Sequence, residues 1–304
     1  MKTGNFILKT PDFYYLCNHI IKYYVMHVVI KDIEDPSEVK LLEDIQREVW
    51  KGEEIVVPSY VMIAAREVGG VLLGAYLDDK LIGFVFGFQG EFKGYRCMYS
   101  HQLAVLDPYQ NYGVGTILKL KQREDALRRG FKLIVWTYDP LRSKNAILNI
   151  NKLGCITNTY LPNHYGEMTD ELNRGVPSDR FMVEWWIDSK WYFRRIRYKY
   201  YEDWNKDIHI ILEARREEED ILPIYHGYLN RDTIGVEIPV DIDNVGRNPQ
   251  EMKVTWRMRT REVFTELFSM GYIIVRYMLY KNHDYKGVYI LKKGFNPEDP
   301  GSWI

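Results

Sequence analysis

One short stretch of this sequence restricts the possible folds more than any other. The segment Arg96–Leu106 has the pattern of a strand, Asp107 and Pro108 break it, and Gly113 and Gly115 then open a long helical pattern. The first-turn amides of a helix lack intrahelical acceptors, and the helix dipole adds partial positive charge there. Two glycines also let a phosphate approach the backbone without a Cβ in the way. The stretch therefore predicts a strand–turn–helix unit that binds an anionic ligand.

The other apolar patterns alternate between strands and helices, which predicts an α/β fold (an α+β mixed sheet) with helices on its faces. Expected strands are 27–33, 71–77, 81–89, 96–106, 131–138, 155–160 and 181–187, and expected helices are 37–49, 58–68, 113–129 and 143–153. A strand at 234–240, a helix at 249–270 and a hairpin at 272–280 with 288–292 predict a second, smaller unit. Its strand–helix–strand order leaves an internal duplication open.

These patterns divide the chain into four parts. We expect an N-terminal extension over 1–25, a first α/β domain over 26–188, a connecting segment over 189–230, and a C-terminal α+β domain over 231–304. The first 25 residues are either a packed extension or precede an alternative start at Met26. The second domain is expected to cover the substrate site or to form a dimer contact.

Composition excludes several classes of protein. Lys and Arg number 41 and Asp and Glu 42, which argues against a dedicated nucleic-acid or acidic-membrane binder. The three cysteines form no CxxC pair and the seven histidines no HxxxH cluster, so we expect neither disulfides nor a metal. The longest apolar runs are too short to span a membrane, and a cytoplasmic location is expected.

Three phosphate-binding motifs compete at the glycine turn. A dinucleotide fingerprint needs a third glycine where Leu118 stands, and a P-loop needs a Gly-Lys-Ser/Thr sequence that is absent. What remains is Gln110-x-x-Gly113-x-Gly115, which resembles the pyrophosphate signature of the GNAT acyltransferase superfamily. The strand Leu103-Ala104-Val105 before it, and a later helix with Asn145 that ends in Lys152-Leu153-Gly154, strengthen a resemblance that covers about residues 27–188.

Longer motifs are similar to a group of GNAT proteins that carry a second α+β unit. They are Trp136–Leu141, Tyr160-Leu161-Pro162, Tyr165-Gly166, Asp179-Arg180, Glu184-Trp185-Trp186, Gly235–Pro239, and Trp256-Arg257 with Thr260-Arg261. Some relatives of that group are associated with N-succinyl transfer and amino-acid racemase pathways. The resemblance thus implies an N-acyltransferase that moves an acetyl or succinyl group from acyl-CoA to a primary amine, on a small, amino-acid-like acceptor.

The resemblance also implies where the cofactor lies. Acetyl-CoA or another acyl-CoA would bind as co-substrate, with its pantetheine arm on a strand that splays from its neighbour. The implied cofactor-binding residues are Leu103, Ala104, Val105, Gln110, Asn111, Tyr112, Gly113, Val114, Gly115, Thr116 and Asn145.

Three residues are candidates for proton transfer. Strand alternation predicts that His101, Leu103 and Val105 share one face near the thioester, and an imidazole suits amine deprotonation. A satisfied core histidine is the alternative. Many GNAT proteins have a tyrosine where Ile150 stands here, so Tyr138 or Tyr165 would protonate the leaving thiolate, or none is needed.

The acceptor side has three candidates. Arg142 and Arg180 could bind a carboxylate in bidentate fashion, or be structural. Trp185 could line the acceptor pocket or pack in the core.

Two rival functions remain. A non-catalytic acyl-CoA-binding or regulatory protein would explain the missing tyrosine. A nucleic-acid or peptide-binding scaffold could use the mixed basic and aromatic segment 190–199, which we instead expect to be a solvated connection.

Overall fold

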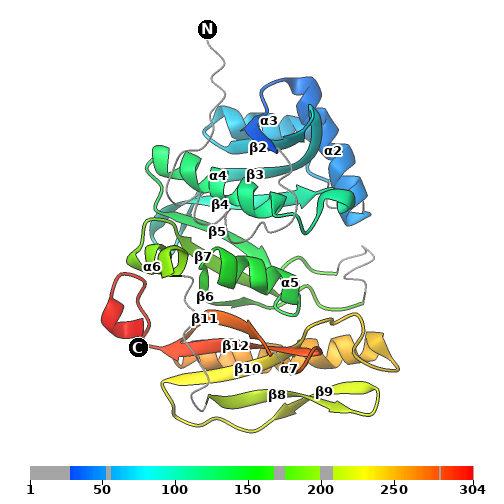
Figure 1. Cartoon of the computed structure of the whole chain (residues 1–304), viewed down its shortest axis with the longest axis vertical. Coiled ribbons are helices and arrows are strands. Elements are labelled where there is room, and N and C mark those ends of the chain that lie inside the picture. Colours follow the sequence, from blue (N-terminus) through cyan, green and yellow to red (C-terminus); the bar gives the residue numbers. More distant parts are fainter. Residues whose placement is uncertain (1–27, 53–55, 168–174, 199–207, 281, 304) are drawn as a thin grey trace.

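The computed structural model describes residues 28–52, 56–167, 175–198, 208–280 and 282–303. The predicted N-terminal extension lies outside this range. Within it, twelve strands form one mixed sheet in the order β1-β2-β3-β4-β5-β7-β6-β11-β12-β10-β8-β9 (Figure 1). The predicted α+β mixed sheet is therefore confirmed.

The first seven strands belong to the N-terminal half. They are β1 (Val29–Asp32), β2 (Val71–Leu77), β3 (Lys80–Phe92), β4 (Tyr95–Val105), β5 (Leu133–Tyr138), β6 (Ile156–Leu161) and β7 (Arg180–Trp186). Between them lie α2 (Pro36–Trp50), α3 (Ser59–Glu67), the short η1 (Asp107–Tyr109), α4 (Val114–Arg128), α5 (Ser143–Ala146) and a π-helical turn, η2 (Ile147–Lys152).

Helices cover the two faces of this half through separate apolar clusters. On one face, α2 and α3 pack on β3 and β4 around Leu42, Met62, Phe84, Phe86 and Ala104. On the other face, α4 and α5 pack on β4 and β5 around Val114, Leu118, Met98, Ile134 and Trp136. Asp35 caps α2 by accepting a 2.8 Å hydrogen bond from the Ser37 amide, next to Pro36 at the first helical position.

The segment predicted as a connection, 189–230, contains regular structure. Helix α6 (Lys190–Tyr198) buries Trp191, Tyr192 and Ile196, whereas Phe193 is exposed, so two of its aromatic residues face the core. Strands β8 (His209–Glu217) and β9 (Asp220–Tyr225) form a hairpin, and β8 pairs in parallel with β10 (Thr233–Pro239). Part of the predicted connection, from His209 onwards, therefore belongs to the sheet of the C-terminal unit.

The rest of the C-terminal unit repeats a strand order of the first half. After β10 come α7 (Pro249–Ser269), β11 (Tyr272–Leu279), β12 (Lys286–Lys293) and η3 (Pro300–Trp303). β12 inserts between β10 and β11, just as β7 inserts between β5 and β6. The two βαββ units meet where β6 pairs with β11 at Thr157 and Ile274. None of the helices in the described ranges combines the length and apolarity that a bilayer span requires.

Candidate active site

The turn into α4 has the features that an anion site needs. Gly113 is the N-cap with a φ of 86°, a left-handed conformation that favours glycine, and no side chain caps the helix. A Cβ built on Gly113 would meet no atom within 4 Å. The first-turn amides therefore have neither a side-chain acceptor nor a neighbouring group above the glycine.

Gly115 lies one position further, against β4. A Cβ there would lie 3.6 Å from Leu103 Cδ2 and 3.9 Å from Val105 Cγ2, which is ordinary van der Waals distance. Because the protein itself leaves room for a methyl group, packing alone does not explain this glycine.

The Gln110 side chain forms hydrogen bonds within the loop between β4 and α4. Its Nε2 donates to the Val105 carbonyl at 3.0 Å and to Asp107 Oδ1 at 2.7 Å. The side chain thus holds the end of β4 against the turn and occupies one of the backbone carbonyls predicted to bind pantetheine.

The other predicted cofactor residues fall into two groups. Asn111, with a φ of 66°, Tyr112 and Asn145 are exposed, whereas the side chains of Val114 and Thr116 are buried. Ala104 also faces the core, towards α2 and α3. Val114, Thr116 and Ala104 can therefore offer a ligand only their backbone groups.

β4 and β5 separate beside this turn. Their parallel pairing consists of Met98 with Ile134 and Tyr99 with Val135. β4 continues to Val105 and β5 to Tyr138 without further pairing to each other, so the edge of β4 that faces β5 is open beyond Tyr99. This geometry agrees with the splayed strand that the resemblance implies.

A β-bulge at His101 changes the predicted faces. Ser100 pairs with Gly87 and Gln102 with Phe86, so His101 is the extra residue on β4. The prediction that His101 shares a face with Leu103 and Val105 is wrong, because the bulge interrupts the alternation. Leu103 and Val105 pack on the α4 side, whereas the His101 ring contacts aromatic rings of the opposite side.

The His101 ring is held among three aromatic rings. Its centroid lies 5.9 Å from that of Phe86, 5.7 Å from Phe88 and 6.1 Å from Tyr99. Desolvation by these neighbours lowers the pKa of His101 below its ordinary value, although the residue remains exposed at the surface. The imidazole is therefore accessible, and it is a base that stays neutral at lower pH than a free histidine.

Hydroxyl groups lie beside this aromatic cluster. Tyr165 and Thr137 share a 2.7 Å hydrogen bond between their hydroxyl groups, and burial followed by the neighbouring Tyr165 raises the pKa of Tyr99. Thr137 lies two residues beyond Val135, the last residue of β5 that pairs with β4. Tyr99, Thr137 and Tyr165 thus line the His101 side of the strand gap, and of these the sequence had singled out only Tyr165.

Tyr138 points elsewhere. Its hydroxyl lies 3.2 Å from that of Tyr289 on β12, which in turn donates to the Pro140 carbonyl at 2.8 Å. Ile150, at the position of the expected tyrosine, is fully buried in the core. The structure therefore places Tyr138 in the seam between the two units, and brings Tyr165 to the His101 side of the gap.

The three residues predicted on the acceptor side lie in different places. Trp185 is fully buried against Trp136 and Tyr192, as the core-packing alternative expects. Arg142 forms an ion pair with Asp243 of the C-terminal unit. Arg180 alone adjoins the hydroxyl cluster, with its guanidinium 5.3 Å from the centroid of the Tyr165 ring.

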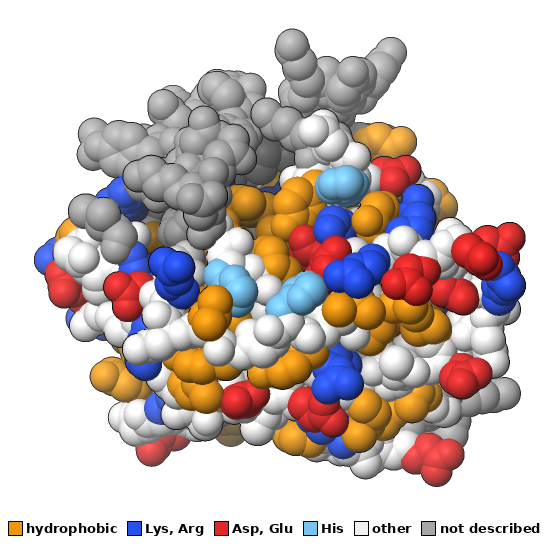
Figure 2. Space-filling view, turned by 90° about the horizontal axis from the view of Figure 1, so that it is seen from below, with side chains coloured by type: hydrophobic (Ala, Val, Ile, Leu, Met, Phe, Trp, Pro, Cys, Tyr) orange, Lys and Arg blue, Asp and Glu red, His pale blue; other side chains and the backbone are white. Residues whose placement is uncertain are grey.

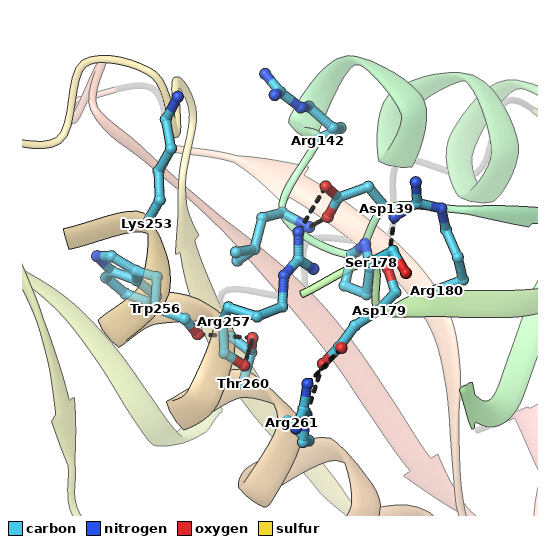
Figure 3. A network of polar contacts seen from close by, with 12 residues as sticks. Asp139, Arg142, Ser178, Asp179, Arg180, Lys253, Trp256, Arg257, Thr260 and Arg261 are labelled. Carbon is cyan, nitrogen blue, oxygen red and sulfur yellow. Dashed lines mark hydrogen bonds and ion pairs between the residues drawn. The ribbon is translucent and has the colours of Figure 1, made fainter. Parts of the chain in front are cut away.

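Arg180 belongs to a charged network that joins the two units (Figure 3). Arg257 of α7 pairs with Asp139 at 2.6 Å, and Arg261 donates to both oxygens of Asp179 at 2.8 and 2.6 Å. Burial would raise the pKa of Asp139, but Arg257 and then Arg180 outweigh it and hold that pKa below its ordinary value. The sequence motifs contain both the arginines and the two carboxylates, but they did not show which residues pair.

Within the described ranges, no group of three His, Cys, Asp or Glu side chains is arranged to hold a metal ion. The site thus combines a helix N-terminus without a side-chain cap, an open strand edge, one imidazole and a set of hydroxyl groups.

Comparison with known proteins gives a family match for part of the chain. Residues 38–148 match the acetyltransferase (GNAT) family, whereas no curated protein matches the chain. An aminoglycoside 6'-acetyltransferase of type Ii is 19% identical, with a TM-score of 0.43, over 52% of this chain and 97% of its own. A GNAT-family acetyltransferase from Streptococcus pneumoniae is 17% identical, with a TM-score of 0.43, over 52% of this chain and 98% of its own.

A third similar structure is a GNAT-family acetyltransferase from Elizabethkingia anophelis with acetyl-CoA bound. It is 18% identical, with a TM-score of 0.39, over 52% of this chain and 96% of its own. Over residues 38–148 the chain carries a domain that matches the acetyltransferase (GNAT) family, and the C-terminal extension lies outside that match.

Proposed function

We propose that the protein transfers an acetyl or succinyl group from acyl-CoA to the primary amine of a small, amino-acid-like acceptor. The observation that carries the proposal is the position of the uncapped turn at Gly113 beside the unpaired edge of β4. A diphosphate on the turn would place the attached arm along Val105 and Leu103, and the acyl end would then approach the point where β4 and β5 part.

His101 and Tyr165 are the proposed proton-transfer residues. The acceptor nitrogen attacks the thioester carbonyl carbon, and His101 takes the proton that the amine sheds. As the C–S bond breaks, the thiolate leaves and takes a proton from Tyr165 or from water. A thiol with a pKa of about 8.5 leaves readily as the thiolate, so the second transfer is not essential.

Arg180 is the proposed binding residue for a carboxylate on the acceptor. Its guanidinium adjoins Tyr165, and two further arginines of the network, Arg257 and Arg261, pair with Asp139 and Asp179. Arg257 Nε and Nη1 also lack acceptors among the described residues. This excess of buried donors favours an anionic acceptor over a neutral amine.

Two measurements test the proposal. Acetyl-CoA or succinyl-CoA is expected to raise the Tm, and free thiol should appear when an amino-acid panel is added, faster than with amines of similar size that lack a carboxylate. Binding of acyl-CoA without thiol release from any amine would instead favour a non-catalytic acyl-CoA-binding protein.

A further inference from the structure

Helix α4 buries a lysine at the point where β4 and β5 part. Lys119 is 1% exposed, and its Nζ donates to Ser100 Oγ at 2.8 Å and to Gln122 Oε1 at 3.0 Å. The same atom lies 3.5 Å from the centroid of the Trp136 ring. Ser100 and Trp136 are the residues that directly follow the last β4–β5 pair, Tyr99 with Val135. The ammonium therefore lies at the vertex of the strand gap.

This ammonium has no counter-charge in the part of the chain that the structure describes. None of the ion pairs there involves Lys119, whose contacts are a hydroxyl, an amide and an indole ring. A buried cation without an anionic partner is costly, and such groups concentrate at functional sites.

The surroundings of Lys119 contain more donors than acceptors. Gln122 Nε2 and Trp185 Nε1 are both buried, and neither has an acceptor among the described residues. The Trp185 ring centroid lies 5.9 Å from Lys119 Nζ. An oxygen atom from a ligand would balance this set, whereas an apolar group would leave it unsatisfied.

Lys119 also lies in line with the proposed cofactor turn. It is four residues after Gly115, so both face the same side of α4. Gly115 lies opposite Leu103 and Val105, and Lys119 lies opposite Ser100. From Val105 to Ser100 a strand extends about 16 Å at about 3.3 Å per residue. An arm that starts at the turn and follows β4 therefore leads to the ammonium.

We infer that Lys119 is a specificity-determining residue that donates to an oxygen of the acyl group of the bound acyl-CoA. The inference rests on the proposed function. That oxygen belongs either to the thioester carbonyl or to the terminal carboxylate of a dicarboxylic acyl group. In both cases the Lys119 ammonium donates a hydrogen bond to it.

Protonation of Lys119 supplies a second test. Burial lowers the pKa of Lys119 to about 7, and the nearby Cys155 acts in the opposite direction. Cys155 is the titratable neighbour, and burial raises the pKa of its thiol well above the ordinary value, so it stays neutral. Ser100, Gln122, Trp136 and Trp185, from β4, α4, β5 and β7, do not titrate in this range.

The experiment compares the affinities of the full chain for CoA, acetyl-CoA and succinyl-CoA by calorimetric titration, in wild type and Lys119→Met. Methionine keeps the length and removes the charge, and Lys121→Met is the matched control, since Lys121 pairs with Glu124 on the same helix. We expect Lys119→Met to lower the preference for acyl-CoA over CoA by about tenfold or more, the size of one charge-assisted hydrogen bond.

The pattern of losses identifies the oxygen. Equal losses for acetyl-CoA and succinyl-CoA assign it to the thioester, and a loss for succinyl-CoA alone assigns it to the terminal carboxylate. A uniform loss that includes CoA, or no loss, overturns the inference.

Wild type alone provides the check that needs no variant. Its preference for acyl-CoA over CoA should be stronger at pH 6 than at pH 8, and a preference that does not change with pH contradicts the inference. If wild type binds none of the three compounds, it is the proposed function that fails.

Discussion

At the scale of single residues, the candidate site depends on how its surroundings tune one imidazole. Phe86, Phe88 and Tyr99 remove part of the water around His101, which disfavours the charged form. The bulge on β4 is what turns this side chain towards the aromatic face, since regular alternation would have placed it against α4. A base with a lowered pKa remains able to accept a proton in mildly acidic solution.

The first prediction concerns this base. His101→Gln should lower kcat by about 10²- to 10⁴-fold, the usual contribution of general base catalysis. Because the pKa of His101 is lowered, the acid limb of kcat/KM in wild type should fall below about 6.5, the ordinary histidine value, and this limb should disappear in the variant.

His226→Gln provides the control, because His226 contacts Glu213 on the surface of the C-terminal unit. Its turnover should match wild type. Near-normal turnover of His101→Gln would remove His101 from the mechanism.

At the scale of elements, local sequence patterns predicted much of the first half but not its irregularities. The glycine turn, α4 and the strand before it follow directly from residues 96–129. The predicted helix over 143–153 is instead α5 followed by a π-helical turn, a register change that side-chain periodicity does not reveal. The bulge at His101 depends on pairing with β3, which an isolated strand pattern cannot show.

Lys119 illustrates the same limit. A lysine in a helix is ordinarily solvated, so its sequence position gave no sign of a buried ammonium. Its burial follows from the packing of α4 against β4 and β5.

The second prediction tests the glycine turn as an element. Gly115→Ala should leave the Tm unchanged or slightly higher, because the protein accommodates the Cβ and alanine favours helix. It should weaken acyl-CoA binding by about ten- to a hundredfold, since the methyl group hinders approach of the phosphates to the first-turn amides that donate hydrogen bonds to them.

Gly90→Ala is the control, because a Cβ at Gly90 also meets no atom within 4 Å but lies on β3, away from the turn. Calorimetric titration with acetyl-CoA distinguishes the two variants. Equal affinity of Gly115→Ala and wild type would contradict a cofactor site at this turn.

At the scale of the whole molecule, the two units form one continuous structure. Phe264 of α7 packs edge-on against Phe181 of β7, with ring centroids 4.8 Å apart, beside the charged network of Figure 3. Asp139, which follows β5 directly, pairs with Arg257 of α7. The C-terminal unit thus contacts the chain directly at the end of β5.

The outer face of that unit carries charges of both signs. Seen from below in Figure 2, basic, acidic and hydrophobic side chains are interspersed among the described residues of this face. The aromatic residues Trp191 and Tyr192 of α6, which the sequence offered as stacking candidates, are buried. The sequence could not reveal the seam itself, because the carboxylates and arginines that form it are about 80 to 120 residues apart.

The last prediction tests whether the seam is part of the folding unit. Arg257→Met should lower the free energy of unfolding by about 3 kcal/mol or more, because it leaves Asp139 buried without its main partner. Arg259→Met, on the same helix but paired with exposed Glu262, should cost about 1 kcal/mol or less. The pKa of Asp139 is lowered in the folded protein, so its stabilising contribution is present above about pH 4 and is lost as pH falls further. Urea unfolding at pH 7 should therefore show a large difference in the free energy of unfolding between wild type and Arg257→Met, and this difference should be smaller at pH 3. Equal losses for the two arginine variants at pH 7 would mean that the C-terminal unit contributes little to the stability of the acyltransferase domain.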